Sequence, residues 1–263
     1  MTRPPLAGVR VVTTREGPAD PVLARHLRLV GARVIGCPAI RLERITRPRG
    51  AVAVVRRWPA FDWIVFTSAA AVRDWNRFRR ARRLGPRGPR AAAVGRETAR
   101  AIRNVLGLRV AAMPKRFSGD ALAGALGPVR GLRILIPRAL VAREALPREL
   151  RRRGATVTIL PLYRTRPDAQ GLLALRRLVL AGRADWVAFA SPSAAASVFG
   201  ALGVAGRRAF RARVRAASIG PTTSAALRRR GLPPAAEAAT STMAGLARAI
   251  LRYHRRRHVT PAR

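Results

Sequence analysis

The sequence contains one pattern written twice, and this duplication constrains the fold more than any other feature. Four segments of the first half match four segments of the second half in the same order, at an offset of 123 residues for three pairs and 125 for the fourth. Such ordered pairs indicate an internal repeat, so we expect two similar lobes. The pairs are GVRVVTTR (8–15) with GLRILIPR (131–138), GARVIGCPAIRLERI (31–45) with GATVTILPLYRTRP (154–167), FDWIVFTSAAAV (61–72) with ADWVAFASPSAA (184–195), and AAAVGRETARAI (91–102) with AASIGPTTSAAL (216–227).

Each half alternates short apolar runs with amphipathic stretches. Runs such as 63–66 and 186–189 are rich in β-branched or aromatic residues and are bounded by Gly, Pro or Ser, which is typical of buried parallel strands. Amphipathic stretches such as 21–30 and 69–78 follow them. Strand–helix alternation predicts a parallel sheet with helices on both faces, so the predicted fold class is α/β.

Two extended runs do not fit this alternation. Residues 34–45 and 157–165 are long, and each contains a proline, Pro38 or Pro161, which disfavours a helix. We interpret them as connectors between lobes. Periodicity leaves two arrangements open: a simple split near residue 130, or a swapped arrangement in which both runs join the same two lobes.

The charge of the chain is extreme. Lys and Arg total 53 against 12 acidic residues, a net charge of +41, and Lys115 is the one lysine. A nucleic-acid partner and a coding bias towards arginine are both possible readings. The arginines are largely scattered, and aromatic residues, which stack on bases, make up 5% of the chain. We therefore expect no specific nucleic-acid partner, while the positive field suits a small polyanionic substrate.

Several classes of protein are disfavoured. No apolar run approaches the roughly 20 residues of a membrane span, and the N-terminal residues lead into a strand-like pattern without a signal-peptide core. The single cysteine, Cys37, excludes an internal disulfide, and with three histidines it provides no metal-ligand cluster. We expect a cytoplasmic protein without a membrane segment, metal or cofactor.

Ligands of parallel α/β sheets bind beyond the carboxyl ends of the strands, so the strand-to-helix turns are the candidate sites. Ser68 follows the run 63–66, and Ser191 occupies the matching place after 186–189. Each serine could simply cap the next helix. Alternatively, the free N–H groups and positive dipole of the helix start could hold a carboxylate.

A second pair of turns repeats the pattern. Gly95 and Thr98 match Gly220 and Thr223, with Thr222 as an additional hydroxyl. Glycine permits a tight turn and a close approach of a ligand. Neither turn has a G-x-G-x-x-G pattern or a P-loop lysine, so a nucleotide site is not indicated. One such turn could be purely structural, but four duplicated turns favour anion binding.

These segments together resemble the uroporphyrinogen-III synthase family over about residues 8–250. DWIVFTSAAAV, AAAVGRETARAI, ADWVAFASPSAA and AASIGPTTSAAL resemble its recurring segments in the family's order, and LPLYRT (160–165) resembles its second connector. The chain departs from the family at Ala190, where threonine often precedes the serine, and in its arginine content.

The resemblance implies a fold and a reaction. It implies the swapped arrangement: lobe 1 from 1–36 plus 168–263, connectors 37–45 and 155–167 paired as a β-ladder, and lobe 2 from 46–154. The family converts hydroxymethylbilane, a linear tetrapyrrole with eight carboxylates, into uroporphyrinogen III. The last pyrrole ring is inverted through a spiro intermediate and water is lost, without a cofactor. We expect this activity, in a monomer whose substrate lies between two lobes.

The resemblance also assigns roles to residues. Tyr163, on the second connector, is the expected proton donor, because a general acid would assist departure of the substrate hydroxyl. Its counterpart in the first half is Ile40, so this feature is not duplicated. The expected substrate-binding residues are Ser68, Thr98, Ser191, Thr222, Thr223, Gly95, Gly220, Arg15 and Arg138, with Arg143 as a further candidate ion-pair partner.

Two other functions remain open at this point. A non-catalytic module of the same fold could sense a tetrapyrrole or another anion. A nucleic-acid-associated protein could depend on charge alone. Incubating the protein with hydroxymethylbilane and resolving the product isomers distinguishes an enzyme from the non-catalytic module. Retention of the protein on DNA at physiological salt tests the nucleic-acid alternative.

Overall fold

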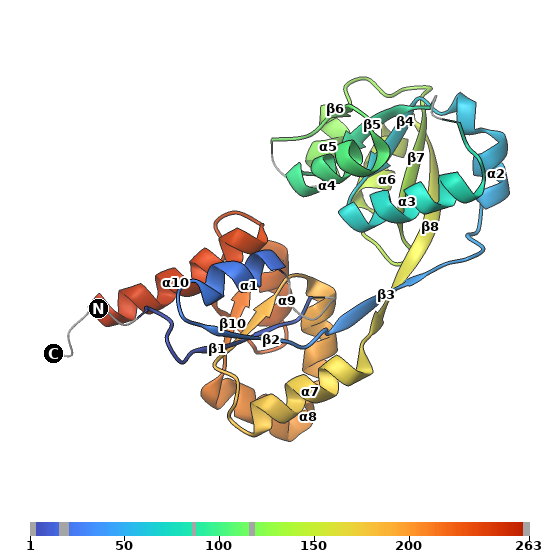
Figure 1. Cartoon of the computed structure of the whole chain (residues 1–263). Coiled ribbons are helices and arrows are strands. Elements are labelled where there is room, and N and C mark those ends of the chain that lie inside the picture. The colour runs from blue at the N-terminus through green and yellow to red at the C-terminus, as the bar shows by residue number, and fades with distance from the viewer. Residues whose placement is uncertain (1–3, 16–20, 86–87, 116–118, 260–263) are drawn as a thin grey trace. The chain divides into compact units, whose positions relative to one another are not determined.

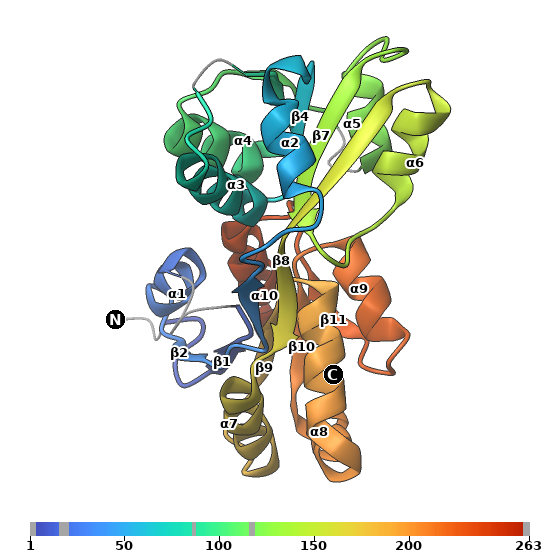
Figure 2. The same ribbon diagram turned by 90° about the vertical axis from the view of Figure 1, so that its right-hand side faces the viewer.

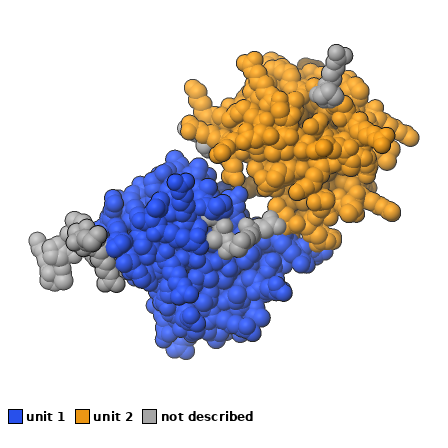
Figure 3. Space-filling model, viewed as in Figure 1, with its two compact units in different colours: residues 1–41, 166–263 blue, residues 42–165 orange. Residues whose placement is uncertain are grey.

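The computed structural model describes residues 4–15, 21–85, 88–115 and 119–259 (Figure 1). The chain divides into two compact units, Met1–Arg41 with Arg166–Arg263 (unit 1) and Leu42–Thr165 (unit 2), shown in two colours in Figure 3. The chain enters unit 2 through β3 (Ile40–Arg44) and returns through β8 (Thr156–Pro167). Each unit contains one sheet, so the predicted α/β class with two helix-flanked, predominantly parallel sheets is confirmed.

Unit 1 is built on five parallel strands in the order β11-β10-β9-β1-β2. The central strand β9 pairs with β1 and β10, which places Val187 between Val12 and Ala216. The strands are β1 (Arg10–Thr13), β2 (Arg33–Gly36), β9 (Trp186–Phe189), β10 (Arg215–Ser218) and β11 (Pro234–Glu237). The helices are α1 (Pro21–Arg28), α7 (Ala169–Leu180), α8 (Pro192–Arg213), α9 (Pro221–Arg228) and α10 (Met243–Val259).

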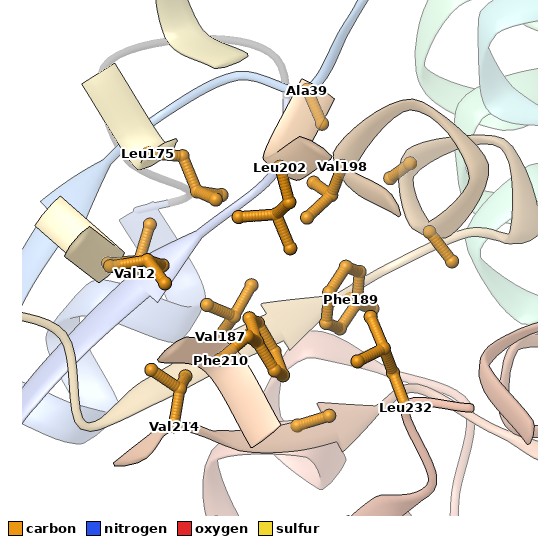
Figure 4. Packing of buried hydrophobic residues seen from close by; sticks show 14 of the residues in the cluster. Val12, Ala39, Leu175, Val187, Phe189, Val198, Leu202, Phe210, Val214 and Leu232 are labelled. Carbon is orange, nitrogen blue, oxygen red and sulfur yellow. The ribbon is translucent and has the colours of Figure 1, made fainter. Parts of the chain in front are cut away.

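The strands of unit 1 are buried on both faces, as expected for a parallel sheet covered by helices. Side chains alternate along a strand, so Val187 and Phe189 of β9 pack with α7, α8 and α9, as Figure 4 shows for part of this cluster. Trp186 and Ala188 point to the other face, where α1 and α10 cover them. This two-sided burial fixes the register of the sheet and therefore the position of its carboxyl edge.

Unit 2 contains six strands in the order β3-β8-β7-β4-β5-β6, and the pairs from β8 to β6 are parallel. The strands besides β3 and β8 are β4 (Trp63–Phe66), β5 (Arg90–Ala93), β6 (Val110–Ala112) and β7 (Arg133–Ala139). The helices are α2 (Ala51–Arg56), the 3-10 turn η1 (Trp58–Ala60), α3 (Ala69–Ala81), α4 (Arg96–Ala101), the π-helical turn η2 (Ile102–Leu106), α5 (Gly119–Ala125) and α6 (Ala145–Arg152).

The core of unit 2 follows the same alternation as that of unit 1. Ile64 and Phe66 of β4 pack with α2, α3 and α4 around the fully buried Trp75, whereas Trp63 and Val65 face α5 and α6. The helix α3 begins directly after β4. Its burial against the sheet therefore determines where the turn at Ser68 lies.

The extended run 34–45 is divided between two elements. Its first residues belong to β2, which pairs with β1, so they form an ordinary sheet strand and not a connector. The later residues form β3, which lies beside β8 (Figures 1 and 2). The Ile45 N–H donates to the Leu162 carbonyl at 2.9 Å, and the Asp168 N–H donates to the Ala39 carbonyl at 3.2 Å. The two segments run antiparallel, because the residue number increases along one segment as that of its partner in the other decreases.

Candidate functional site

The turn after β4 is built around the Ser68 side chain. Ser68 is the N-cap of α3, with extended backbone, and its Oγ accepts a hydrogen bond from the Ala71 N–H at 3.1 Å. This is the capping function that the residue type favours. The serine is half-buried at the carboxyl edge of the unit 2 sheet, where the other amides of the first turn of α3 remain available to an anion.

Tyr163 contacts the same serine. The Tyr163 Oη lies 2.9 Å from the Ser68 Oγ, and the tyrosine is 7% exposed. Strand β7 lies between β4 and β8 in the sheet, and it pairs with β4 through Ile134 and Leu135. Beyond these pairs, the Ser68 and Tyr163 side chains connect the carboxyl end of β4 to β8. Burial raises the pKa of Tyr163 above its ordinary value, and the hydrogen bond with Ser68 opposes that rise. The phenol is therefore neutral at physiological pH and able to donate a proton.

Arg138 is turned inward and engaged within the protein. It is 7% exposed, and its guanidinium donates to the Glu144 carboxylate and, at 3.1 Å, to the Arg143 carbonyl. The loop that follows β7 is fixed further by the Leu140 N–H, which donates to the Tyr163 carbonyl at 2.7 Å. The geometry thus favours a role for Arg138 in holding this loop beside Tyr163, while Arg143 contributes a backbone carbonyl.

The turn after β5 is less suited to an anion. Gly95 precedes α4 in an extended conformation, and Thr98 is 5% exposed. Glu97 lies in the first turn of this short helix. Its carboxylate interacts favourably with the helix dipole and would repel a second anion. The matching residue of the second half is Thr222, so this acidic residue is not duplicated.

In unit 1, Ser191 repeats the role of Ser68. Its Oγ accepts from the Ala194 N–H at 3.2 Å and lies 3.1 Å from the Ser193 Oγ. Arg15 is half-buried just beyond β1, the neighbour of β9 in the sheet. Because carboxyl ends of adjacent parallel strands meet at one edge, Ser191 and Arg15 belong to the same edge of the unit 1 sheet.

The turn after β10 joins this edge. Thr222 is exposed, whereas Thr223 is 2% exposed and its N–H donates to the Gly220 carbonyl at 3.0 Å. A Cβ at Gly220 would lie 2.6 Å from the Ser241 Oγ, so a larger residue there would force the Ser241 side chain to rotate. Thr222 is therefore the threonine of this turn that is available to a ligand.

A buried polar group behind this turn was not predicted from the sequence. The Ser218 Oγ lies 2.5 Å from the Ser224 Oγ, and Ser224 donates to the Glu237 carboxylate. Both serines are fully buried. The bonds tie β10, α9 and β11 together behind Gly220. The available signal was the pair of serines inside AASIGPTTSAAL, which flank the glycine turn.

The described part of the chain contains no group of three or more His, Cys, Asp and Glu residues that could hold a metal ion. Within the same residues, no helix is long and apolar enough to cross a bilayer.

The chain is thus an α/β protein that offers donors to an anionic ligand. Its two predominantly parallel sheets carry serine-capped helices at their carboxyl edges, and one buried tyrosine is bonded to a capping serine.

The model of the family described as "Uroporphyrinogen-III synthase HemD" matches residues 21–248. A putative uroporphyrinogen-III synthase of Methanothermobacter thermautotrophicus is 30% identical over 241 residues, covering 88% of this chain and 89% of the relative. The uroporphyrinogen-III synthase of Synechococcus elongatus is 30% identical over 185 residues, covering 67% and 70%.

Solved structures share the fold. A mutant uroporphyrinogen III synthase from the extremely thermophilic bacterium Thermus thermophilus superposes with a TM-score of 0.67 at 22% identity, covering 95% of this chain and 100% of that one. The enzyme from Helicobacter pylori 26695 gives a TM-score of 0.58 at 16% identity, covering 93% and 99%. The chain belongs to the uroporphyrinogen-III synthase HemD family. Its activity is that of uroporphyrinogen-III synthase, a hydro-lyase of tetrapyrrole biosynthesis.

Proposed function

We propose that Tyr163 donates the proton that lets the hydroxyl group of hydroxymethylbilane leave as water. The C–O bond breaks with its electron pair going to oxygen, and the positive charge stays on the pyrrole that carried the hydroxyl. Attack on this electrophile, rearrangement through the spiro intermediate and ring closure release one proton, which restores the phenol. Atoms and charge then balance for the conversion of hydroxymethylbilane into uroporphyrinogen III and water.

The observation that carries the proposal is the 2.9 Å contact between the Tyr163 Oη and the Ser68 Oγ. The Ser68 Oγ already accepts the Ala71 N–H, so its own hydrogen is available for the tyrosine oxygen. In that arrangement the phenolic hydrogen of Tyr163 is not used by Ser68 and can be donated to the substrate, and the serine stabilises the charge that forms on the phenol oxygen. General-acid assistance of this kind contributes typically about 10²-fold to 10⁴-fold in rate.

Each unit by itself has helix starts with groups that suit a carboxylate. In unit 2, the start of α3 at Ser68 offers free amides, and in unit 1 the starts of α8 and α9 offer Ser191 and Thr222 with the amides beside Gly220. Arg15 adds a cation at the unit 1 edge. Thr98 and Thr223 are buried, so we assign them to support of their turns. Holding the substrate ends in a reactive orientation is the main task of these groups.

We further propose a cytoplasmic monomer with no specific nucleic-acid partner. The arginine content supports a diffuse positive field, which raises the local concentration of a substrate with eight carboxylates.

The proposal is tested with the variant Tyr163→Phe and the matched control Tyr253→Phe. Tyr253 is the other tyrosine of the chain, and its Oη accepts from the Arg215 Nε at 3.1 Å, so each change removes one hydroxyl group. With fresh hydroxymethylbilane and isomer-resolved product analysis, Tyr163→Phe should lower kcat about tenfold or more, and Tyr253→Phe less than about twofold. Unchanged turnover of Tyr163→Phe would refute the proton-donor role and leave the family assignment intact.

A further inference from the structure

Unit 2 contains an arginine-lined pocket that the catalytic proposal does not use. The cavity has a volume of about 630 Å³ and lies at α2, the segment before it, and the end of α3. Four arginines line it, Arg47, Arg56, Arg57 and Arg82. We name it the α2 pocket. Its volume falls within the range of about 300 to 1,000 Å³ that is usual for small-molecule sites.

The other lining residues are apolar or lack a side chain. They are Pro48, Gly50, Ala51, Val52 and Ala53. Val52 is 65% exposed, so its apolar side chain is accessible to a ligand. The pocket therefore combines apolar with cationic lining residues.

The four guanidinium groups have no acidic partner among the residues that the structure describes, and no acidic residue lines the cavity. The acid on the neighbouring helix is already engaged, since Asp74 of α3 pairs with Arg77 at 2.9 Å and lies 3.9 Å from Arg44. Four cations around one cavity repel one another unless an anion lies between them. The charge of the pocket is thus uncompensated by the described protein, and an anionic ligand would balance it.

The α2 pocket is separate from Tyr163 and Ser68. Ser68 caps the start of α3, and Arg82 follows its end after 13 residues. At about 1.5 Å per residue, the helix places Arg82 about 20 Å from the serine, towards the opposite edge of the sheet. Figure 1 shows α2 beside one end of α3. A ligand in this pocket would leave the proposed catalytic pair free.

We propose that the α2 pocket binds an aromatic polyanion, a molecule with an apolar ring and two or more carboxylate or phosphate groups. Arginine suits this ligand because its planar guanidinium both stacks on rings and forms paired bonds with carboxylate or phosphate oxygens. Arg82 already lies over an aromatic face, 5.3 Å from the centre of the Phe78 ring. The apolar residues Ala51 and Val52 receive the ring, and the arginines receive the anionic groups.

The test is calorimetric titration of three probes, ATP, benzene-1,3,5-tricarboxylate and tripolyphosphate, at about 0.15 M ionic strength to screen the general field. Both ring-bearing probes should bind, with one site per chain, and whichever binds more tightly identifies phosphate or carboxylate as the preferred group. Tripolyphosphate should bind at least about fivefold more weakly than ATP, because it has no ring to cover the apolar lining residues. Equal affinities for tripolyphosphate and ATP would overturn the proposal.

The triple variant Arg56→Gln, Arg57→Gln, Arg82→Gln isolates the pocket from the overall charge. Its matched control is Arg176→Gln, Arg177→Gln, Arg208→Gln, which removes three exposed arginines from α7 and α8 of unit 1. The pocket variant should lose at least about tenfold in affinity for ATP, and the control less than about twofold. Equal losses, or no binding of either ring-bearing probe to the unaltered protein, would contradict a built site. Thermal melts of both variants check that the fold is retained.

Discussion

Ser68 and Tyr163 are 95 residues apart in the chain, yet their hydroxyl oxygens lie 2.9 Å apart. The same serine oxygen caps α3 through the Ala71 N–H. One side chain therefore contacts both the start of the helix and the phenol, so a change at Ser68 is expected to alter both.

The substitution Ser68→Ala should lower kcat about fivefold to tenfold and raise KM. The alanine removes a hydrogen bond to the phenol, worth about 1 kcal/mol, and a helix cap of similar size. Steady-state kinetics with hydroxymethylbilane measure both constants. Ser68→Thr keeps a hydroxyl group and should restore most of kcat, which a purely structural defect would not predict.

Ser191→Ala provides the matched control for this substitution. Ser191 caps α8 as Ser68 caps α3, but among the described residues its Oγ bonds to Ser193 and Ala194 and to no tyrosine. The variant should raise KM and leave kcat within about twofold. An equal fall of kcat in both alanine variants would show that the tyrosine contact is irrelevant to the chemical step.

With Tyr163 as the proposed proton donor, the pH dependence of the reaction is expected to follow from the environment of this phenol. Burial raises its pKa above the ordinary value of about 10, so the proton-donating form persists to higher pH than for an exposed tyrosine. The contribution of this group to stability is complete below the unfolded pKa of about 10 and is lost as the pH rises through the higher folded value. In Ser68→Ala the opposing hydrogen bond is absent, so the pKa should rise further. Ultraviolet titration of the tyrosines, with Tyr163→Phe as the reference, measures the shift, and a lower pKa in Ser68→Ala would contradict this account.

The sheets and the duplicated turns could be predicted because they depend on local patterns. Buried parallel strands such as 63–66 carry continuous apolar runs, and Ser68 and Ser191 stand where helix caps are expected. The run 34–45 was harder, because extended residues look alike whether they pair within a sheet or pass between units. Pairing partners such as Val9 and Arg33 are distant in sequence, and local periodicity does not identify them.

The site could be predicted only in part. The position of Tyr163 came from the family resemblance, since its duplicate position is Ile40 and the repeat gives no signal there. Arg138 was expected to face a ligand, but its interaction with Glu144 depends on the path of the loop after β7. Among 52 arginines, sequence does not indicate which side chains turn inward. The acid-paired Ser224 was missed for the same reason, because Glu237 reaches it from another strand.

Asp62 and Asp185 occupy matching positions, directly before β4 and β9, and should contribute unequally to stability. The Asp185 carboxylate accepts the Arg10 backbone N–H at 2.7 Å and also pairs with the Arg10 guanidinium at 2.7 Å. Its counterpart Asp62 accepts the Arg133 backbone N–H at 2.7 Å. Asp185→Asn should therefore lower the free energy of unfolding by about 1 to 2 kcal/mol, and Asp62→Asn by less than about 1 kcal/mol.

The same pair gives a pH test. The hydrogen bond from Arg10 lowers the pKa of Asp185, so the stability it contributes is present above the unfolded pKa of about 3.9 and is lost as the pH falls through the lower folded value. In urea unfolding, the difference between the unaltered protein and Asp185→Asn should shrink below about pH 4. A difference that stays constant into acid would mean that the charge of Asp185 contributes nothing.

Gly171 should resist substitution although it lies in a helix, where alanine is ordinarily the better residue. An added Cβ at Gly171 would lie 2.1 Å from the Pro38 carbonyl oxygen, and backbone cannot yield as a flexible side chain can. Gly171→Ala should lower the free energy of unfolding by about 2 kcal/mol or more. Gly124, in α5, has no atom within 4 Å of an added Cβ, so Gly124→Ala should be neutral or stabilise by up to about 1 kcal/mol. Denaturant unfolding of both variants measures the contrast. Equal effects would show that the helix packs less closely on Pro38 than the structure indicates, and that the start of α7 has room to adjust.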